Sequence, residues 1–239
     1  MKRHTIFGAT AVIAMTLVLV STPVNAATIW TESFDDALGF TTSEAFFSDG
    51  SGDFFGLYGV ASDFGAGASP SAVKAYTAFD VVTGNILTGM DLDGEGATLP
   101  ITLTWTGINI TGLTGLQFSG DFAEFFDDPG DIDDADDMIL IEYQIDGGGY
   151  QGLLAFEGGA FSNDPYNGYF MQDTDFDGVG DGTALGDAAQ TFSQLIPGTG
   201  STLDIRLTVS VNSGDEDFAV DNFIVVDAVP VELQSFSIE

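Results

Sequence analysis

The sequence has few positive charges and no cysteine. Its 239 residues contain four Lys and Arg, one His and no Cys, against 37 Asp and Glu. Lys2, Arg3 and His4 stand at the start, so Lys74 and Arg206 are the only cations in the rest of the chain. Beyond residue 4 this composition excludes disulfides, thiolate nucleophiles, a histidine base and His- or Cys-bound zinc. Two cations cannot neutralise a phosphate backbone, so nucleic acid is excluded as a direct partner and anionic lipid is disfavoured.

The N-terminus has the pattern of a secretory signal. Lys2 and Arg3 precede an apolar run of about 15 residues, from Ile6 to Val20, and small residues follow up to Ala26. A transmembrane helix needs ~20 apolar residues, so cleavage after Ala26 is favoured over a membrane anchor. We therefore predict a signal peptide at residues 1–26 and no membrane insertion after its removal, which leaves the mature chain with a net charge of −35.

Strand signals dominate the rest of the chain. Glycine is abundant, at 31 residues, and no segment has helical periodicity. Apolar residues alternate with polar ones through Leu203–Val211 and through Met138–Ile145, and Asp146 and Gly147 after the second run favour a tight hairpin. Further strands are predicted at residues 28–34, 100–110, 116–125, 150–156, 190–196 and 218–226. The pattern predicts one all-β domain at residues 27–228, an antiparallel β-sandwich of the jelly-roll type.

The sharpest acidic motif lies at residues 173–181. Asp173, Asp175 and Asp177 alternate before Gly178, which matches the D-x-D-x-D-G opening of an EF-hand calcium loop. Ala184 stands where the bidentate Glu of an EF-hand belongs, so Asp181 or Asp187 would have to replace it. The crowded carboxylates have no nearby Lys or Arg and repel one another. A calcium ion would relieve this repulsion, and a solvated acidic turn is the alternative.

Two weaker acidic clusters could form a second metal site. Asp91, Asp93 and Glu95 surround Gly94, and residues 127–137 contain seven aspartates, Asp133 and Asp137 among them. Acid runs are usually solvated loops, so both interpretations stay open.

Two further acids fall in predicted strands. Period-two alternation places Asp221 on the face of Ala219, Phe223 and Val225, and Glu32 stands close to Phe34. An aspartate among apolar neighbours needs a partner. No free cation is present in the sequence to supply one.

Thr31–Asp35 and Asp217–Val225 stand at the two ends of the predicted domain. These two stretches resemble the ends of bacterial β-jelly-roll modules of the carbohydrate-binding-module type. The resemblance implies that Glu32 and Asp221 hold a structural calcium ion, and that Asp173, Asp175 and Asp177 hold another. It implies no catalytic residue.

The middle of the chain is similar to a jelly-roll region of secreted marine-bacterial proteins, some of them attached to extracellular nucleases. The stretches concerned are Gly52–Gly56, residues 137–150 and residues 170–183, the last of which is also similar to thrombospondin type-3 calcium loops. The tail at residues 229–239 is similar to a PVEL-x-SF segment near the C-termini of many secreted Bacteroidetes proteins, where it often leads into a sorting domain. A short frayed or edge-pairing tail is the alternative.

These observations together predict a secreted, calcium-stabilised binding module, exported to the medium or surface of a Gram-negative bacterium. The expected partner is an extracellular polysaccharide or surface glycan, for which Tyr166 and Tyr169 are the candidate aromatic platforms. Trp105 shares a predicted strand face with Ile101 and Leu103, which places it in the core. The alternatives are a structural or adhesive exoprotein with no small ligand and, third, a glycoside hydrolase that uses two carboxylates.

Overall fold

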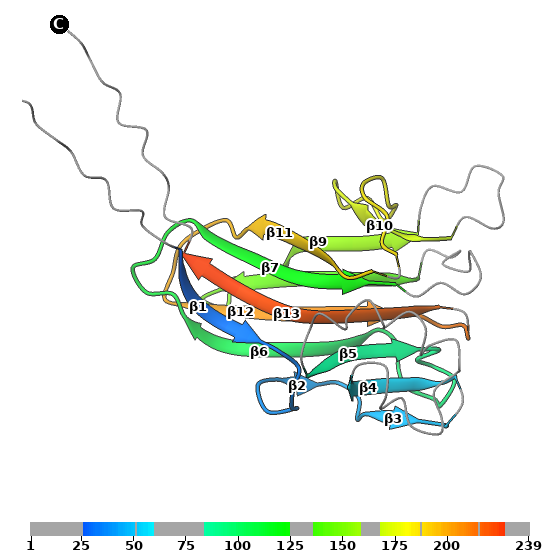
Figure 1. The fold of residues 1–239 in the computed structure, drawn as a ribbon. Coiled ribbons are helices and arrows are strands. Elements are labelled where there is room, and N and C mark those ends of the chain that lie inside the picture. The colour runs from blue at the N-terminus through cyan, green and yellow to red at the C-terminus, as the bar shows by residue number, and fades with distance from the viewer. Residues whose placement is uncertain are drawn as a thin grey trace, which may run out of the picture.

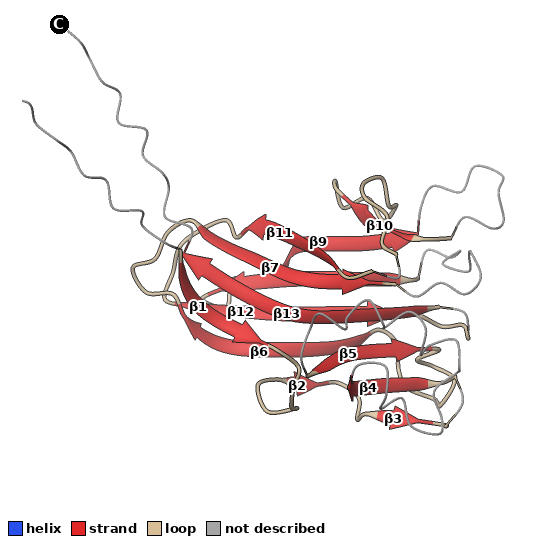
Figure 2. Cartoon of the chain, viewed as in Figure 1, coloured by secondary structure: helices blue, strands red, loops and turns tan. Residues whose placement is uncertain are grey.

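The computed structural model describes residues 26–50, 52–59, 84–124, 136–158, 168–186, 188–214 and 216–227. The predicted signal peptide up to residue 25 and the C-terminal tail lie outside these ranges, as do Asp133, Tyr166 and Asp187. The described ranges consist of strands and loops (Figure 2). No helix within them is long and apolar enough to cross a bilayer.

Thirteen strands are present in the described part of the chain. They are β1 (Ala27–Glu32), β2 (Thr41–Thr42), β3 (Phe47–Ser48), β4 (Phe54–Gly59), β5 (Asn85–Met90), β6 (Ile101–Asn109), β7 (Leu116–Ala123), β8 (Met138–Ile145), β9 (Gln151–Gly158), β10 (Phe170–Asp173), β11 (Gln190–Leu195), β12 (Thr202–Ser210) and β13 (Asp217–Asp227).

These strands form two antiparallel sheets that pack face to face (Figure 1). The seven-stranded sheet has the order β11-β7-β13-β5-β4-β3, with β1 also paired to β13, and the six-stranded sheet has the order β10-β9-β8-β12-β6-β2. The chain crosses between the sheets at each step from β5 to β8 and again at each step from β10 to β13. This repeated crossing is the connectivity of a jelly roll, so the predicted fold class is confirmed.

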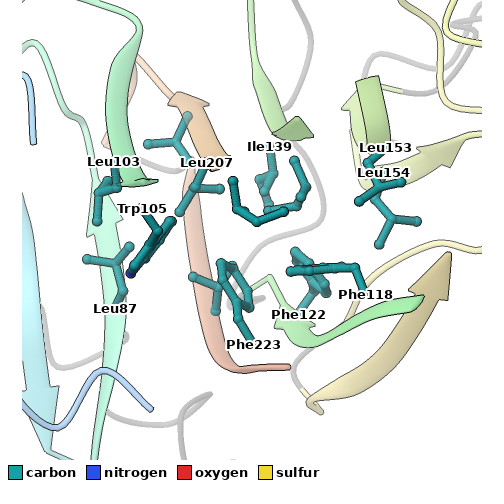
Figure 3. Packing of buried hydrophobic residues seen from close by; sticks show 14 of the residues in the cluster. Leu87, Leu103, Trp105, Phe118, Phe122, Ile139, Leu153, Leu154, Leu207 and Phe223 are labelled. Atoms are coloured by element: carbon teal, nitrogen blue, oxygen red, sulfur yellow. The ribbon is translucent and has the colours of Figure 1, made fainter. Parts of the chain in front are cut away.

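The core lies between the two sheets. Leu203, Ile205 and Leu207 of β12 are fully buried, as their alternation predicts, and Trp105 is only 1% exposed. Figure 3 shows Trp105 and Leu207 of one sheet facing Phe223 of the other. Each such side chain contributes about 1.5–3 kcal/mol by leaving water. Apolar packing therefore holds the sheets together without any disulfide, since the chain has no cysteine.

Candidate cation sites and the polar face of the six-stranded sheet

A β-bulge in β13 determines where Asp221 points. The register with β7 shifts between Asp221 and Ile224, and Asn222 has a φ of +52°. Asn tolerates this left-handed conformation better than most residues, and the extra residue reverses the alternation that follows. Phe223 and Val225 therefore face the core, whereas Asp221 lies opposite Asp121 on the outer side of the sheet. The prediction that Asp221 shares a face with Phe223 and Val225 was wrong for this reason.

The Asp221 carboxylate is completely buried and only partly satisfied. Its Oδ1 accepts a hydrogen bond of 2.7 Å from the backbone N–H of Asn222, whereas its Oδ2 has no hydrogen-bond partner. Burial, as the largest cause, and the nearby carboxylates of Asp121, Asp35 and Glu32 together raise the pKa of Asp221 to about 7, although the Asn222 hydrogen bond lowers it. We call these four acids the Asp221 group. An ionised carboxylate in this position has a desolvation cost that the single donor, the Asn222 N–H, offsets only in part.

The other acids of the group have donors of their own. Glu32 accepts hydrogen bonds of 2.8 Å from the backbone N–H of Phe34 and from Nε1 of Trp105, which ties β1 to the opposite sheet. Asp121 accepts a hydrogen bond of 3.0 Å from Nδ2 of Asn222. Asp221 Oδ2 is therefore the oxygen of the group for which a bound cation would supply the missing partner. Carboxylate oxygens of this kind are the ligands that Ca²⁺ prefers.

The acidic loop after β10, residues 173–181, brings three carboxylates together. One oxygen each of Asp173, Asp175 and Asp177 lies within 4.8 Å of the others. Asp173 is 2% exposed and accepts backbone N–H groups of Asp175 at 3.1 Å, Phe176 at 2.7 Å and Gly178 at 2.9 Å. Repulsion from Asp177 raises the pKa of Asp175. The predicted trio thus converges in space, and the backbone alone already satisfies its buried member.

Asp181 accepts hydrogen bonds from within the same loop. Its carboxylate accepts hydrogen bonds from the backbone N–H of Thr174 at 3.0 Å and from the Thr174 hydroxyl at 2.8 Å, and these bonds lower its pKa. It therefore closes the loop through Thr174 and does not join the set of three carboxylates.

In the second predicted cluster, Glu95 of the predicted motif converges with two acids that were not predicted. Asp49, Asp53 and Glu95 form the other set of three acids within 4.8 Å of one another in the described ranges. Burial, as the largest cause, and the neighbouring Asp53 and Asp93 together raise the pKa of Asp91 to about 6. Asp49 and Asp53 flank the turn between β3 and β4, and sequence reasoning missed them because that hairpin was not predicted.

The remaining members of that cluster lie apart or outside. Asp93 lines a cavity of about 380 Å³ together with Asp136, the neighbour of the fully buried Asp137. Asp133 lies outside the described residues. The structure thus brings Asp91 and Asp93 toward the β3–β4 turn and places Asp93 beside the start of β8.

The outer side of the six-stranded sheet carries a hydrogen-bonded polar network. Arg206, the one cation among the described residues, donates two hydrogen bonds to Glu142, from Nε at 2.6 Å and from Nη2 at 2.7 Å. The Tyr150 ring covers the guanidinium, with its centroid 3.9 Å from Cζ. Thr208 donates a further hydrogen bond of 3.0 Å to Glu142. The planar groups are therefore held in fixed orientations by one another.

The same network extends toward the end of the sheet. Asp204 accepts hydrogen bonds from Nε2 of Gln144 at 2.8 Å and from the backbone N–H of Gly107 at 2.7 Å. We call this surface the polar face and define it by its side chains, which are Thr104, Glu142, Gln144, Tyr150, Asp204, Arg206 and Thr208. Of the predicted aromatic platforms, Tyr169 is partly buried just before β10 and Tyr166 lies outside the described residues.

The strands and the polar face define an antiparallel jelly-roll β-sandwich with one hydrogen-bonded outer sheet surface. The sequence matches no protein-family model, and a comparison with curated proteins gives no match either. Several solved structures are similar over most of the chain, although each has a TM-score below 0.5.

Three of these structures differ in what they do. The CBM22-1 xylan-binding domain from Paenibacillus barcinonensis has 8% identity over 86% of this chain and 97% of its own, with a TM-score of 0.41. The K1 cleaved adhesin domain of Lys-gingipain from Porphyromonas gingivalis has 13% identity over 82% and 96%, with a TM-score of 0.41. A Stig cyclase from Fischerella has 14% identity over 84% and 98%, with a TM-score of 0.42. The likeness does not distinguish binding from catalysis.

Proposed function

We propose that this chain is a secreted, calcium-stabilised β-sandwich module that binds carbohydrate on the polar face. The observation that carries the proposal is Tyr150 stacked on Arg206, with the guanidinium fixed by Glu142. A sugar presents an apolar C–H surface beside hydroxyl groups, and a partly exposed ring among oriented donors and acceptors complements both. Binding sites for small ligands combine aromatic surface with a few fixed polar groups in this way.

Calcium is the second part of the proposal. The buried Oδ2 of Asp221 lacks a protein donor, and burial together with the carboxylates around it raises the pKa of Asp221. The trio of Asp173, Asp175 and Asp177 offers a second, more exposed place for an ion. An ion bound only by the folded state stabilises it, by about 2.7 kcal/mol at a hundredfold excess over Kd.

Secretion rests on the N-terminal pattern of residues 1–26, and a glycan outside the cell is the partner that fits an exported binding module. A structural or adhesive exoprotein with no small ligand is the alternative. Retention of the protein on immobilised polysaccharide distinguishes the two functions.

Depletion of the full chain onto a panel of insoluble polysaccharides tests the glycan part. We expect retention on at least one glycan, at least a tenfold loss in Tyr150→Ala, and little change in Tyr169→Ala. Loss in Tyr169→Ala with Tyr150→Ala unchanged would move the site to the loop before β10. A flat signal across all glycans would favour the structural alternative.

A further inference from the structure

Phe176 occupies an unusual position in the acidic loop. It is the third residue after Asp173, it has a φ of +61°, and its side chain is 47% exposed. A bulky residue rarely adopts this backbone conformation, and residues held in it cluster at sites that contact ligands. The hydrogen bond from the Phe176 N–H to Asp173 fixes the backbone there. The loop therefore exposes an aromatic ring to solvent from a backbone conformation that phenylalanine rarely adopts.

Gly152 provides the surface on which this ring lies. A Cβ atom at Gly152 would lie 2.6 Å from Cε1 of Phe176, so any larger residue in β9 would displace the ring. Gly152 is opposite Glu142 in the pairing of β9 with β8, and directly opposite residues point to the same side of a sheet. The Phe176 ring therefore lies on the outer side of the six-stranded sheet, beside Glu142.

The strand registers place this ring in line with the polar face. Glu142 is opposite Arg206 in β12, and Arg206 is opposite Thr104 in β6. Neighbouring strands are ~4.8 Å apart, so Phe176 and the guanidinium under Tyr150 are separated by about two strand spacings, ~10 Å. A single row perpendicular to the strands thus runs from the Phe176 ring across Glu142 and Arg206 to Thr104.

The charges along this row are unfavourable for an anionic ligand. The charge of Arg206 is already paired with Glu142, and Asp204 adds a negative charge in the same network. The whole chain has a net charge of −33, which repels anions at longer range. A carboxylate or sulfate group on the ligand would meet no unpaired cation among the described residues.

We propose that Phe176 is the second aromatic contact of the carbohydrate site and that the site takes an uncharged polysaccharide chain lying across β9, β8 and β12. This inference rests on the proposed function. The acidic loop then contributes directly to binding, through the ring that it holds over Gly152. Tyr150 and Phe176 contact the ligand from the two ends of the paired Glu142 and Arg206.

Native affinity electrophoresis of the full chain tests this inference. The gels contain a soluble neutral β-glucan, xylan or mannan, or the anionic alginate. We expect retardation of the wild type by at least one neutral glycan and not by alginate. Phe176→Ala should weaken it at least fivefold, and Phe176→Tyr, which keeps the ring, should restore it. Leu195→Ala, which removes an exposed apolar side chain from the other sheet, should leave it unchanged.

The outcomes separate this inference from the proposed function. If Tyr150→Ala loses retardation while Phe176→Ala is retarded as strongly as the wild type, the role of Phe176 is overturned and the proposed function is unaffected. No retardation of the wild type by any glycan overturns both, and retardation by alginate alone overturns the uncharged ligand. Should Phe176→Ala fail to fold, the wild type is titrated with a neutral oligosaccharide and the NMR chemical shifts of the Phe176 ring protons are followed. Shifts that change support the contact, and unchanged shifts contradict it.

Discussion

The Asp221 group and the acidic loop at residues 173–181 both gather carboxylates, yet their hydrogen bonding differs. In the loop, the buried Asp173 accepts three backbone N–H groups. In the Asp221 group, the buried Oδ2 of Asp221 has no partner. The number of nearby acids is therefore a poor guide to which region depends on a cation. The number of hydrogen-bond donors that reach the most buried carboxylate oxygen is a better guide, because a buried charge without a partner is costly.

The largest expected effect of a cation is at Asp221. We expect Ca²⁺ to raise the Tm of the wild type well beyond NaCl of equal ionic strength, and Asp221→Asn to lose most of this gain, about 2–3 kcal/mol at a hundredfold excess over Kd. In chelator at pH 8, by contrast, Asp221→Asn should have a higher Tm than the wild type. The folded pKa of Asp221, about 7, lies above the ordinary 3.8, so ionised Asp221 destabilises the fold at that pH and Asn does not.

Thermal unfolding in CaCl₂ and in EDTA measures both effects. The exposed Asp36→Asn serves as the control for loss of one charge. Equal responses to calcium in wild type and Asp221→Asn would mean that the ion binds elsewhere or that salt acts by screening alone.

Glu124 tests the effect of burial on a carboxylate apart from the effect of neighbouring acids. It is 4% exposed, and burial raises its pKa to about 8 while the N–H of Phe170 donates to it at 2.7 Å. The folded pKa exceeds the ordinary 4.5. The stability of the fold with respect to Glu124 is therefore highest below pH 4.5, and it falls as the pH rises through 8 and the folded protein loses this proton. Glu124→Gln keeps an acceptor and removes the titration. We expect a gain of about 2–4 kcal/mol at pH 8 and none at pH 4.

Urea unfolding across this pH range checks the effect of Glu124→Gln. The gain should be the same with and without calcium, in contrast to Asp221→Asn. A gain that calcium abolishes would place Glu124 at a cation site.

Smaller changes are expected in the acidic loop. Asp173→Ala removes the acceptor of three backbone N–H groups and should cost about 1–3 kcal/mol. Asp175→Asn removes a repelling charge and should change the free energy of unfolding by less than about 0.5 kcal/mol without calcium. Calorimetric titration of Asp175→Asn with calcium should show one ion fewer than the wild type. An unchanged number of ions would identify the loop as a solvated acidic turn.

A small effect on stability, but a clear effect on binding, is expected at the polar face. Arg206→Lys replaces the paired guanidinium with an ammonium that cannot donate two parallel bonds to Glu142. Because the ion pair is partly exposed, with side-chain exposures of 30% and 12%, unfolding should change by less than about 1 kcal/mol. Retention on polysaccharide should nevertheless fall severalfold. A loss of stability without a loss of retention would make the pair structural.

The sequence predicted the regular strands well. Strict alternation located β8 and β12, and the shared face of Trp105 with Ile101 and Leu103 predicted its burial. It missed β5, in which five consecutive residues are buried, so that neither face is polar and no alternation exists. β4, with two glycines in six residues, gave no strand signal either.

The sites were less predictable because they depend on local departures from regularity. The bulge at Asn222 reversed the face of Asp221, and no spacing rule announces an inserted residue. The contact of Phe176 with Gly152 arises because the loop folds back over β9, which joins segments distant in sequence. By contrast, the local D-x-D-x-D-G motif did predict that Asp173, Asp175 and Asp177 converge.

A crystal structure of the full chain grown in CaCl₂, with anomalous data, tests the calcium site most directly. An anomalous peak within about 2.3–2.6 Å of Asp221 Oδ2 is expected, since this is the range of calcium–oxygen bonds. A water molecule at ordinary hydrogen-bond distance from that oxygen, with no anomalous signal, would contradict the claim that a cation completes the Asp221 group.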